Sequence, residues 1–247
     1  DGKSTLMTIL AGKLKADSGQ VTVRGNTRIG FMDQRDDIYL QSTVKDVVIG
    51  EMAEYEWASD PRIRDVIDGL ISDIDFDSQM DRLSGGQRRR VNLAKLLIGD
   101  WDVLMLDEPT NHLDLDAVYW LSGHLKNRWS KSQGGLLVVT HDRWFLDEVC
   151  TQTWEVHPGG LDSFEGGYAA YILQRAERDR QAAATESRRQ NLLRKELAWL
   201  RRGAPARTTK PKFRIDAANE LIANEPPPRD PLELKKLATT RLGKDVV

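Results

Sequence analysis

Apolar residues along the first two thirds of the chain fall into short continuous runs and into helical spacings. The runs at 103–106 and 136–140 are apolar at nearly every position, which is typical of parallel strands buried on both faces of a sheet. Shorter strands are predicted at 20–24, 28–32, 151–157 and 161–164. Strands that alternate with helical segments indicate an α/β fold with a mostly parallel sheet.

Apolar residues at helical spacing predict helices between these strands. The helices are expected after Ser4 (buried side Leu6, Met7, Ile9, Leu10 and Leu14), at 43–52 behind a Thr43 cap, at 61–70 from Pro61, at 87–98 before Gly99, and at 117–129. Tyr55 and Trp57 are expected to pack within this region. Arg88, Arg89 and Arg90 are expected to face solvent, with nucleic-acid contact as the alternative.

The last third of the chain has a different composition. Residues 168–202 contain no Gly or Pro and are rich in Ala, Arg, Gln, Glu and Leu, which favours one helix of roughly 50 Å at 1.5 Å per residue. Residues 203–211 break it, and a second helix is predicted at 212–223 before three prolines at 226–228. Two helices joined by a short loop predict an antiparallel helical hairpin.

Charge separates the same two regions. The chain of 247 residues has a net charge of −2, but residues 174–214 hold 13 basic and 4 acidic side chains, a net charge of +9. The other residues therefore carry 23 basic and 34 acidic side chains, a net charge of −11. This asymmetry indicates a basic arm that meets an anion, often a nucleic acid. A single cysteine and the lack of an apolar run of ~20 residues favour a cytoplasmic protein that does not cross a membrane.

The stretch 83–114 holds the strongest chemical pattern. Ser84, Gly85, Gly86 and Gln87 precede a predicted helix, and the backbone N–H groups of such a turn suit a phosphate. The apolar strand 103–106 then ends in Asp107 and Glu108, and adjacent carboxylates can serve as metal ligand and general base. A strand that ends in Asp-Glu is common by itself, but the two patterns together with residues 111–114 are not expected by chance.

The chain begins with half of a phosphate-binding loop. Gly2, Lys3, Ser4 and Thr5 match the end of the pattern G-x-x-x-x-G-K-[ST], in which Lys reaches the β- and γ-phosphates and the hydroxyl binds Mg²⁺. Because the chain starts inside this motif, without Met, we expect it to be part of a longer protein. Residues 229–247 are predicted to begin a second, similar domain.

The order and spacing of these motifs resemble the ATP-binding cassette ATPases, with a signature sequence, a Walker B strand and a D-loop. Asn111 and His112 in the D-loop are similar to the ABC-F branch rather than to transporter cassettes. The resemblance implies a P-loop NTPase core with a helical subdomain at 1–167 and a basic helical hairpin linker at 168–228. It also implies ATP and Mg²⁺ as ligands and hydrolysis of ATP to ADP and phosphate.

The family resemblance assigns roles residue by residue. The expected catalytic residues are Glu108, which orients water, the switch residue His141 and the Q-loop residue Gln34. The expected ATP-binding residues are Gly2, Lys3, Ser4, Thr5, Ser84, Gly85, Gly86, Gln87 and Asp114. The expected Mg²⁺ ligands are Ser4, Asp107 and Gln34. The signature residues would serve a nucleotide held by a second cassette, so the chain alone is expected to hydrolyse ATP poorly.

The linker leaves the biological target open. Its predicted tip gathers six basic residues expected to contact nucleic acid: Arg201, Arg202, Arg207, Lys210, Lys212 and Arg214. In ribosome-bound ABC-F proteins this linker reaches toward transfer RNA, whereas the region 196–207 resembles the Uup-like branch, which is also linked to branched DNA. Action on the ribosome is the main hypothesis. A branched-DNA-binding ATPase is the alternative, and a transporter cassette the least favoured one.

Overall fold

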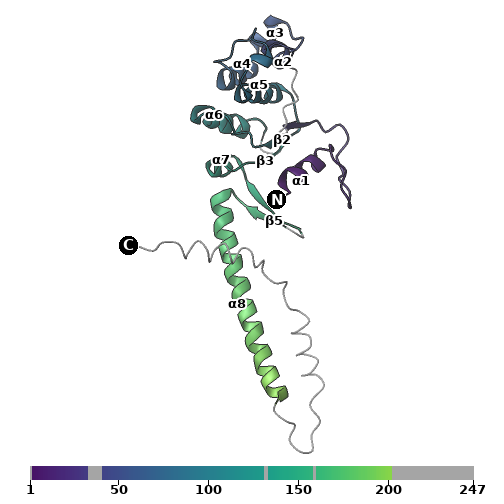
Figure 1. The fold of residues 1–247 in the computed structure, drawn as a ribbon, viewed down its shortest axis with the longest axis vertical. Coiled ribbons are helices and arrows are strands. Elements are labelled where there is room, and N and C mark those ends of the chain that lie inside the picture. The colour runs from purple at the N-terminus through teal and green to yellow at the C-terminus, as the bar shows by residue number, and fades with distance from the viewer. Residues whose placement is uncertain (1, 33–40, 131–132, 158–159, 202–247) are drawn as a thin grey trace, which may run out of the picture. The chain divides into compact units, whose positions relative to one another are not determined.

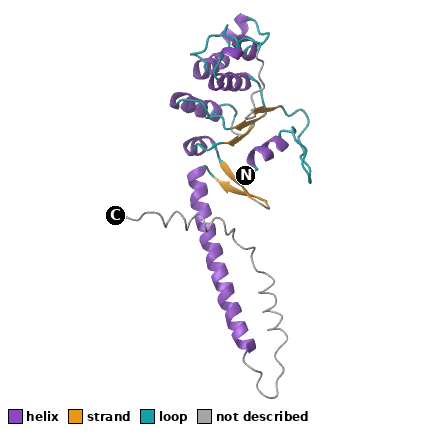
Figure 2. Ribbon diagram, viewed as in Figure 1, coloured by secondary structure: helices purple, strands orange, loops and turns teal. Residues whose placement is uncertain are grey.

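The computed structural model describes residues 2–32, 41–130, 133–157 and 160–201, with only the backbone at 199–201. The chain divides into two compact units, 1–174 and 175–247. Figures 1 and 2 show the helices and strands of the described residues. The structure therefore tests the predictions for the first unit and for most of one helix that continues into the second.

The first unit is built around a parallel sheet. Its strands are β1 (Ile29–Met32), β2 (Val103–Asp107) and β3 (Gly135–Val139), in the order β1-β2-β3, with Asp107 opposite Val139. In β2 the Leu104 and Leu106 side chains are fully buried, as predicted. Every residue of β3 is only half-buried, which corrects the prediction of a buried strand, because β3 lies at one edge of the described sheet.

Helices connect and cover these strands. They are α1 (Lys3–Leu10), α2 (Val44–Val48), α3 (Glu54–Ser59), α4 (Pro61–Leu70), a 3-10 turn (Met80–Arg82), α5 (Gly85–Ile98), α6 (Leu115–Lys126) and α7 (Arg143–Val149). The antiparallel hairpin is formed by β4 (Gln152–His157) and β5 (Gly160–Glu165), as predicted. An α/β core with a parallel sheet and a helical region between β1 and β2 is thus confirmed.

The helical region follows the predicted caps. Thr43 accepts a hydrogen bond from the Asp46 N–H, and Asp46 bonds back to the Thr43 N–H, so a capping box begins α2. Trp57 packs against Phe76 at 5.9 Å between ring centroids, as expected. Tyr55 is 75% exposed, however, and its predicted packing role is wrong. Helix α3 has no buried residue, and of its aromatic side chains Trp57 packs against the core whereas Tyr55 does not.

Two predictions near the start of the chain are also wrong. Residues 20–24 form no strand, and Val21 and Val23 are 41% and 49% exposed. Both valines line an apolar groove of about 720 Å³ with residues of α1, β3 and β4. Among the described residues, no strand forms backbone pairs with residues 20–24. In α1 only Met7 is buried, and Leu6 and Leu10, which line the same groove, are half-buried.

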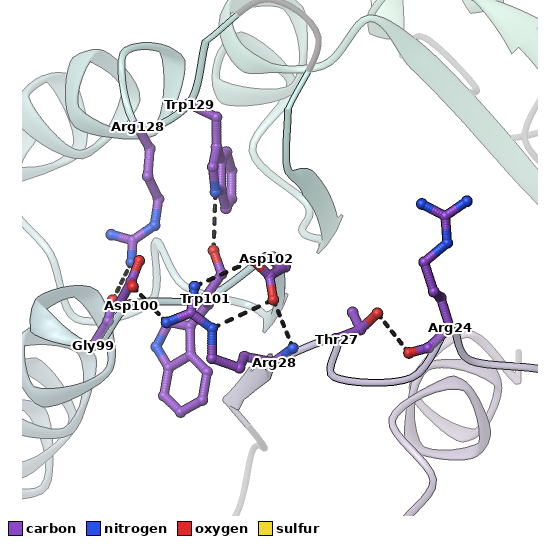
Figure 3. A network of polar contacts seen from close by, with 9 residues as sticks. All are labelled: Arg24, Thr27, Arg28, Gly99, Asp100, Trp101, Asp102, Arg128 and Trp129. Carbon is purple, nitrogen blue, oxygen red and sulfur yellow. Dashed lines mark hydrogen bonds and ion pairs between the residues drawn. The ribbon is translucent and has the colours of Figure 1, made fainter.

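An ion-pair cluster precedes β1 and β2 (Figure 3). The Arg28 guanidinium lies between Asp100 and Asp102, with 3.2 Å from its Nη2 to Asp102 Oδ1, and the Arg28 backbone N–H donates to Asp102 Oδ2 at 2.8 Å. These hydrogen bonds raise the pKa of Arg28 and lower the pKa of Asp102. The cluster thereby joins the segments that lead into two neighbouring strands.

A second set of contacts in Figure 3 holds the end of α5. Arg128 donates to the carbonyls of Leu97 and Gly99, the first at 2.7 Å from Nη1. Trp129 donates from Nε1 to the Trp101 carbonyl at 3.0 Å, and Trp101 donates to the Leu96 carbonyl at 2.7 Å. Carbonyls left free at the end of a helix need such donors. Gly99 ends α5 as predicted.

The long helix predicted after residue 167 is present as α8 (Tyr168–Arg201). Ion pairs one turn apart stabilise its surface, Arg180 with Glu177 at 2.9 Å and Arg189 with Glu186 at 2.8 Å. The predicted second helix at 212–223, and with it the hairpin, lies outside the described residues, as does the segment 229–247. In the part of the chain that the structure describes, no helix has the length and apolarity to traverse a membrane.

Candidate functional site

The carboxylate pair lies where β2 ends. Asp107 is 1% exposed and Glu108 is 7% exposed. The Glu108 N–H donates to the Val139 carbonyl at 2.7 Å, which extends the pairing of β2 with β3 by one residue. Glu108 has a φ of +51°, a left-handed conformation that non-glycine residues adopt at a cost of about 1–3 kcal/mol. Such strain persists only where neighbouring contacts hold the backbone, and it is concentrated at functional sites.

The Glu108 side chain faces the loop after β3. Its Oε1 lies 3.4 Å from His141 Nε2, and its Oε2 accepts from the His141 N–H at 3.4 Å. The His141 side chain is 87% exposed, so it can reach a ligand while it remains next to the carboxylate. The Thr110 and Thr140 hydroxyls, 3.0 Å apart, join the two loops that follow β2 and β3. The structure therefore brings together two of the predicted catalytic residues.

The other carboxylate has an open coordination position. Asp107 Oδ1 is buried and has no hydrogen-bond partner among the described residues. A buried carboxylate oxygen without a partner is costly unless a cation or a donor completes it. Mg²⁺ is held by one or two carboxylates together with waters and substrate phosphates, so the absence of a group of three or more ligands in the described residues is compatible with it. Asp107 thus fits a magnesium ion.

The half phosphate-binding loop opens α1 as predicted. Gly2 has a φ of +87°, which favours glycine, and its carbonyl accepts from the Leu6 N–H at 2.9 Å. Lys3 and Thr5 are exposed and Ser4 is half-exposed, so all three are accessible to a ligand. Lys3 lines the same groove as Thr140, which directly precedes His141. Lys3 and the start of the loop after β3 therefore border one groove.

The signature turn begins α5. The Ser84 hydroxyl accepts from the Gln87 N–H at 3.2 Å and Gln87 Oε1 accepts from the Ser84 N–H at 3.0 Å, a capping box. A methyl group on Gly85 would meet no atom within 4 Å, whereas one on Gly86 would lie 3.2 Å from His112 Cβ. The open Gly85 leaves room for a ligand at the helix N-terminus.

The signature turn and the D-loop share a cleft of about 770 Å³. Its lining includes Ser84, Gly86, Gln87 and Asp114, the last of which also caps α6 by accepting from the Ala117 N–H at 2.8 Å. The predicted residues Lys3, Asp107, Glu108 and His141 are not part of the lining. The described site residues therefore form two separate groups, one around Glu108 and one around Ser84.

The roles of three residues near the site were not recognised from the sequence. Arg89, expected in solvent, is 8% exposed, and Arg90 binds Asp73, so the predicted solvent-exposed arginine face is wrong for both. Arg89 lies one turn before Leu93, which is 1% exposed, and that spacing could have revealed its inward position. His112 has a φ of +66° and contacts Gly86, a structural role that its place in the D-loop did not reveal.

Several predicted site residues lie outside the described residues or have no described side chain. Gln34 lies outside the described residues. Arg201 belongs to α8, but its side chain is not described. The remaining arm residues also lie outside the described part: Arg202, Arg207, Lys210, Lys212 and Arg214.

Comparison with known proteins decides the family. Two family models, both described as ABC transporter, match residues 1–111 and 154–235. The chain belongs to the ATP-binding cassette family. Members of this family bind ATP and hydrolyse it, generally with Mg²⁺. The matched residues include the half phosphate-binding loop, the signature turn and the end of β2.

Relatives of this cassette include proteins of the ABC-F branch. The YfmR protein of Bacillus subtilis, described as an uncharacterized ABC transporter ATP-binding protein, is 35% identical over 100% of this chain and 44% of its own length. EttA, the energy-dependent translational throttle protein, is 32% identical in Escherichia coli K12 over 91% of this chain and 46% of its own length. The EttA protein of Mycobacterium tuberculosis H37Rv is 32% identical over 100% of this chain and 50% of its own length. The predicted resemblance to ABC-F ATPases is confirmed, and the finer Uup-like assignment stays a prediction.

The chain spans about half the length of these relatives. Among solved structures, the cassette is similar to a complex of the archaeal ribosomal stalk protein aP1 with the recycling factor aABCE1, with a TM-score of 0.59 and 24% identity over 71% of this chain and 34% of that one. At this identity the likeness concerns the fold. It agrees with the parallel sheet and helical region described above.

Proposed function

We propose that this chain is the first cassette and the linker of a two-cassette ABC-F ATPase that acts on the ribosome. The observation that carries the proposal is the end of β2, where Glu108 Oε1 lies 3.4 Å from His141 Nε2 and a buried Asp107 oxygen has no hydrogen-bond partner among the residues described. Hydrolysis of a phosphoanhydride by water needs positioning and charge stabilisation rather than a covalent intermediate. The residues present supply both.

Each residue near β2 has a defined part in this mechanism. Glu108 accepts a hydrogen bond from the attacking water and orients it, which contributes ~10² to 10⁴-fold in rate for a general base. Lys3 binds the β- and γ-phosphates, and His141 donates to the γ-phosphate from its exposed ring. Asp107 and Ser4 would hold Mg²⁺, which neutralises charge on the phosphates.

The second group of residues serves another nucleotide. Ser84, Gly86 and Gln87 border a cleft that does not include the carboxylate pair, so they are available to ATP bound by a second cassette. Each ATP then lies between the phosphate-binding loop of one cassette and the signature turn of the other. The chain by itself lacks that partner and hydrolyses ATP poorly. Robust turnover by the isolated, monomeric chain would contradict the two-cassette arrangement.

The ribosome is proposed from the relatives and from the linker. The relatives named EttA are translational throttle proteins by name. Residues 174–214 carry a net charge of +9, and Lys and Arg side chains that neutralise phosphates give nucleic-acid binding a strong salt dependence. Figure 1 shows α8 as one uninterrupted helix. Within it, residues 174–201 hold 8 basic and 4 acidic side chains, a net charge of +4.

The decisive experiment uses the complete protein with Glu108→Gln and the same change in its second cassette. This protein should bind ATP without hydrolysing it and should co-sediment with ribosomes only when ATP is present. Glu51→Gln, at an exposed position on the surface, is the matched control. Loss of ATP-dependent retention, together with salt-sensitive binding of branched DNA, would move the function to DNA metabolism.

The arm is tested separately. Arg207→Glu with Lys210→Glu should weaken ribosome binding at least tenfold at fixed salt, because two phosphate contacts are reversed. Lys15→Glu with Arg24→Glu makes the same charge change at exposed positions of the cassette and should have little effect. Equal ribosome binding by the arm variant and the control variant would show that the arm does not contact the ribosome.

A further inference from the structure

Helix α5 carries more than the signature turn. One turn after Gly85, three consecutive arginines follow at positions 88–90, and their side chains have different surroundings. Arg89 is 8% exposed, one of the few charged residues in the core of the described part. An arginine is rarely buried without partners, since a desolvated charge must be compensated.

The partners of Arg89 are the backbone oxygens at the end of β2. Its Nη2 donates to the Asp107 carbonyl at 2.7 Å and lies 3.3 Å from the Glu108 carbonyl. Hydrogen bonds from a charged donor are shorter and stronger than those between neutral groups. Arg89 therefore links the signature helix to the two residues proposed to hold Mg²⁺ and to orient water.

The backbone at this point needs such support. Glu108 has a left-handed φ of +51°, and its N–H is held by the Val139 carbonyl at 2.7 Å. The Arg89 guanidinium holds the peptide oxygens on both sides of the same residue. Because the Glu108 side chain lies 3.4 Å from His141, a change in φ at Glu108 would move its carboxylate away from the switch loop.

The opposite side of α5 is tied to the helical region. Arg90 forms two bonds of 2.7 Å with the Asp73 carboxylate and donates to the Leu70 carbonyl at 3.0 Å. Adjacent arginines thus fasten α5 to the end of α4 on one side and to the end of β2 on the other. A displacement of the signature turn would be transmitted through this helix to the backbone of Glu108.

We infer that Arg89 is a positioning residue for ATP hydrolysis. By holding the backbone of Glu108, Arg89 makes the position of the Glu108 carboxylate depend on the position of helix α5. This inference rests on the proposed ATPase function. If it is correct, the position of the Glu108 carboxylate changes when a nucleotide binds at Ser84, and that nucleotide belongs to the other ATP site. Arg89 itself does not touch the nucleotide.

The test compares two arginines that donate to backbone carbonyls, the buried Arg89 and the half-buried Arg128, in the complete protein. Arg89→Lys and Arg89→Gln remove the bonds to the Asp107 and Glu108 carbonyls. Arg128→Lys removes bonds of the same kind, to the Leu97 and Gly99 carbonyls, at the other end of α5. Steady-state phosphate release gives kcat and KM, and thermal unfolding gives the stability of each variant.

We expect kcat to fall about 10- to 100-fold in the Arg89 variants with KM for ATP within about threefold, since a misplaced catalytic group costs rate more than binding. Arg128→Lys should lower the melting temperature with kcat within about twofold. Added guanidinium at millimolar concentration should restore part of the rate of Arg89→Gln and none of the loss in Glu108→Gln.

Unchanged kcat in the Arg89 variants, or a KM effect alone, would overturn the inference. So would unfolding of Arg89→Lys under conditions in which Arg128→Lys stays folded, because the contact would then be structural. The proposed function fails in a different way, with no hydrolysis by the unmodified protein or no loss of hydrolysis in Glu108→Gln.

Discussion

Residues 100–102, just before β2, have side chains or carbonyls that are hydrogen-bonded to neighbouring segments. At the carboxyl end of β2, one buried carboxylate oxygen has no hydrogen-bond partner in the part of the chain that the structure describes. Arg28 pairs with Asp100 and Asp102 at the first end (Figure 3). Asp107 Oδ1 and the left-handed Glu108 lie at the second. Five residues of one strand thus separate a region held by ion pairs and hydrogen bonds from one with a left-handed backbone.

The difference shows which end of β2 is stabilised by contacts with neighbouring segments and which end is less stable. Donors from Arg128 and Trp129 hold the helix end and the strand start at the amino end. At the carboxyl end, the open oxygen of Asp107 fits the Mg²⁺ ion of the proposed mechanism, and the left-handed Glu108 is strained. Changes at the first end should therefore alter folding, and changes at the second should alter catalysis.

The largest expected effect is at the carboxyl end. In the complete protein, Glu108→Gln should lower kcat for ATP hydrolysis by ~10² to 10⁴-fold, because the amide cannot accept a proton or polarise water. ATP binding, measured by equilibrium titration, should change less than about threefold, and the melting temperature should not fall. A variant that loses stability instead of rate would contradict the contrast between the two ends.

The next effect is expected at the amino end. Arg128→Met should lower the free energy of unfolding by about 2–3 kcal/mol, because the carbonyls of Leu97 and Gly99 lose their charged donor. Denaturant unfolding measures the loss, and kcat per folded molecule should stay within about twofold of the unmodified protein. A large loss of kcat at unchanged stability would show that this end is coupled to the chemistry.

A pair of glycines sharpens the comparison. A methyl group on Gly30 would lie 2.8 Å from the Trp101 ring and 2.9 Å from Leu104 Cδ1, so Gly30→Ala should cost about 1–3 kcal/mol of stability. Gly85→Ala meets no atom within 4 Å and should keep stability, but it should weaken hydrolysis in the two-cassette protein by obstructing the signature turn. Equal stability losses in both variants would contradict the packing described at the two positions.

The smallest effect concerns pH. Burial lowers the pKa of His124 below its usual value of 6.5, and the side chain is bonded to Asp65 and lies 3.4 Å from Arg128. Below pH 6.5 the unfolded chain binds more protons at this site than the folded one, so stability falls on acidification. His124→Gln should flatten the dependence of unfolding free energy on pH between 7 and 5, by at most about 1.4 kcal/mol per unit. An identical slope in both proteins would contradict this.

Much of the core followed from the sequence because its signals are local. The β2 run has to be buried on both faces, and the Thr43 cap and the Ser84 turn begin their helices through contacts within three residues. The strand predicted at 20–24 failed because alternation alone does not supply a pairing partner. The half-buried state of β3 likewise depends on what lies beside it in the sheet.

The sequence by itself determined the order of the motifs, the family, the parallel strands and the residues at the end of β2. Only the tertiary structure decided that Arg89 turns inward to the Asp107 and Glu108 carbonyls, that Glu108 takes a left-handed φ next to His141, and that Gly86 packs against His112. These facts depend on contacts between residues 18 to 33 positions apart. A side chain's type fixes what it can bond, whereas the fold decides which carbonyl lies within its reach.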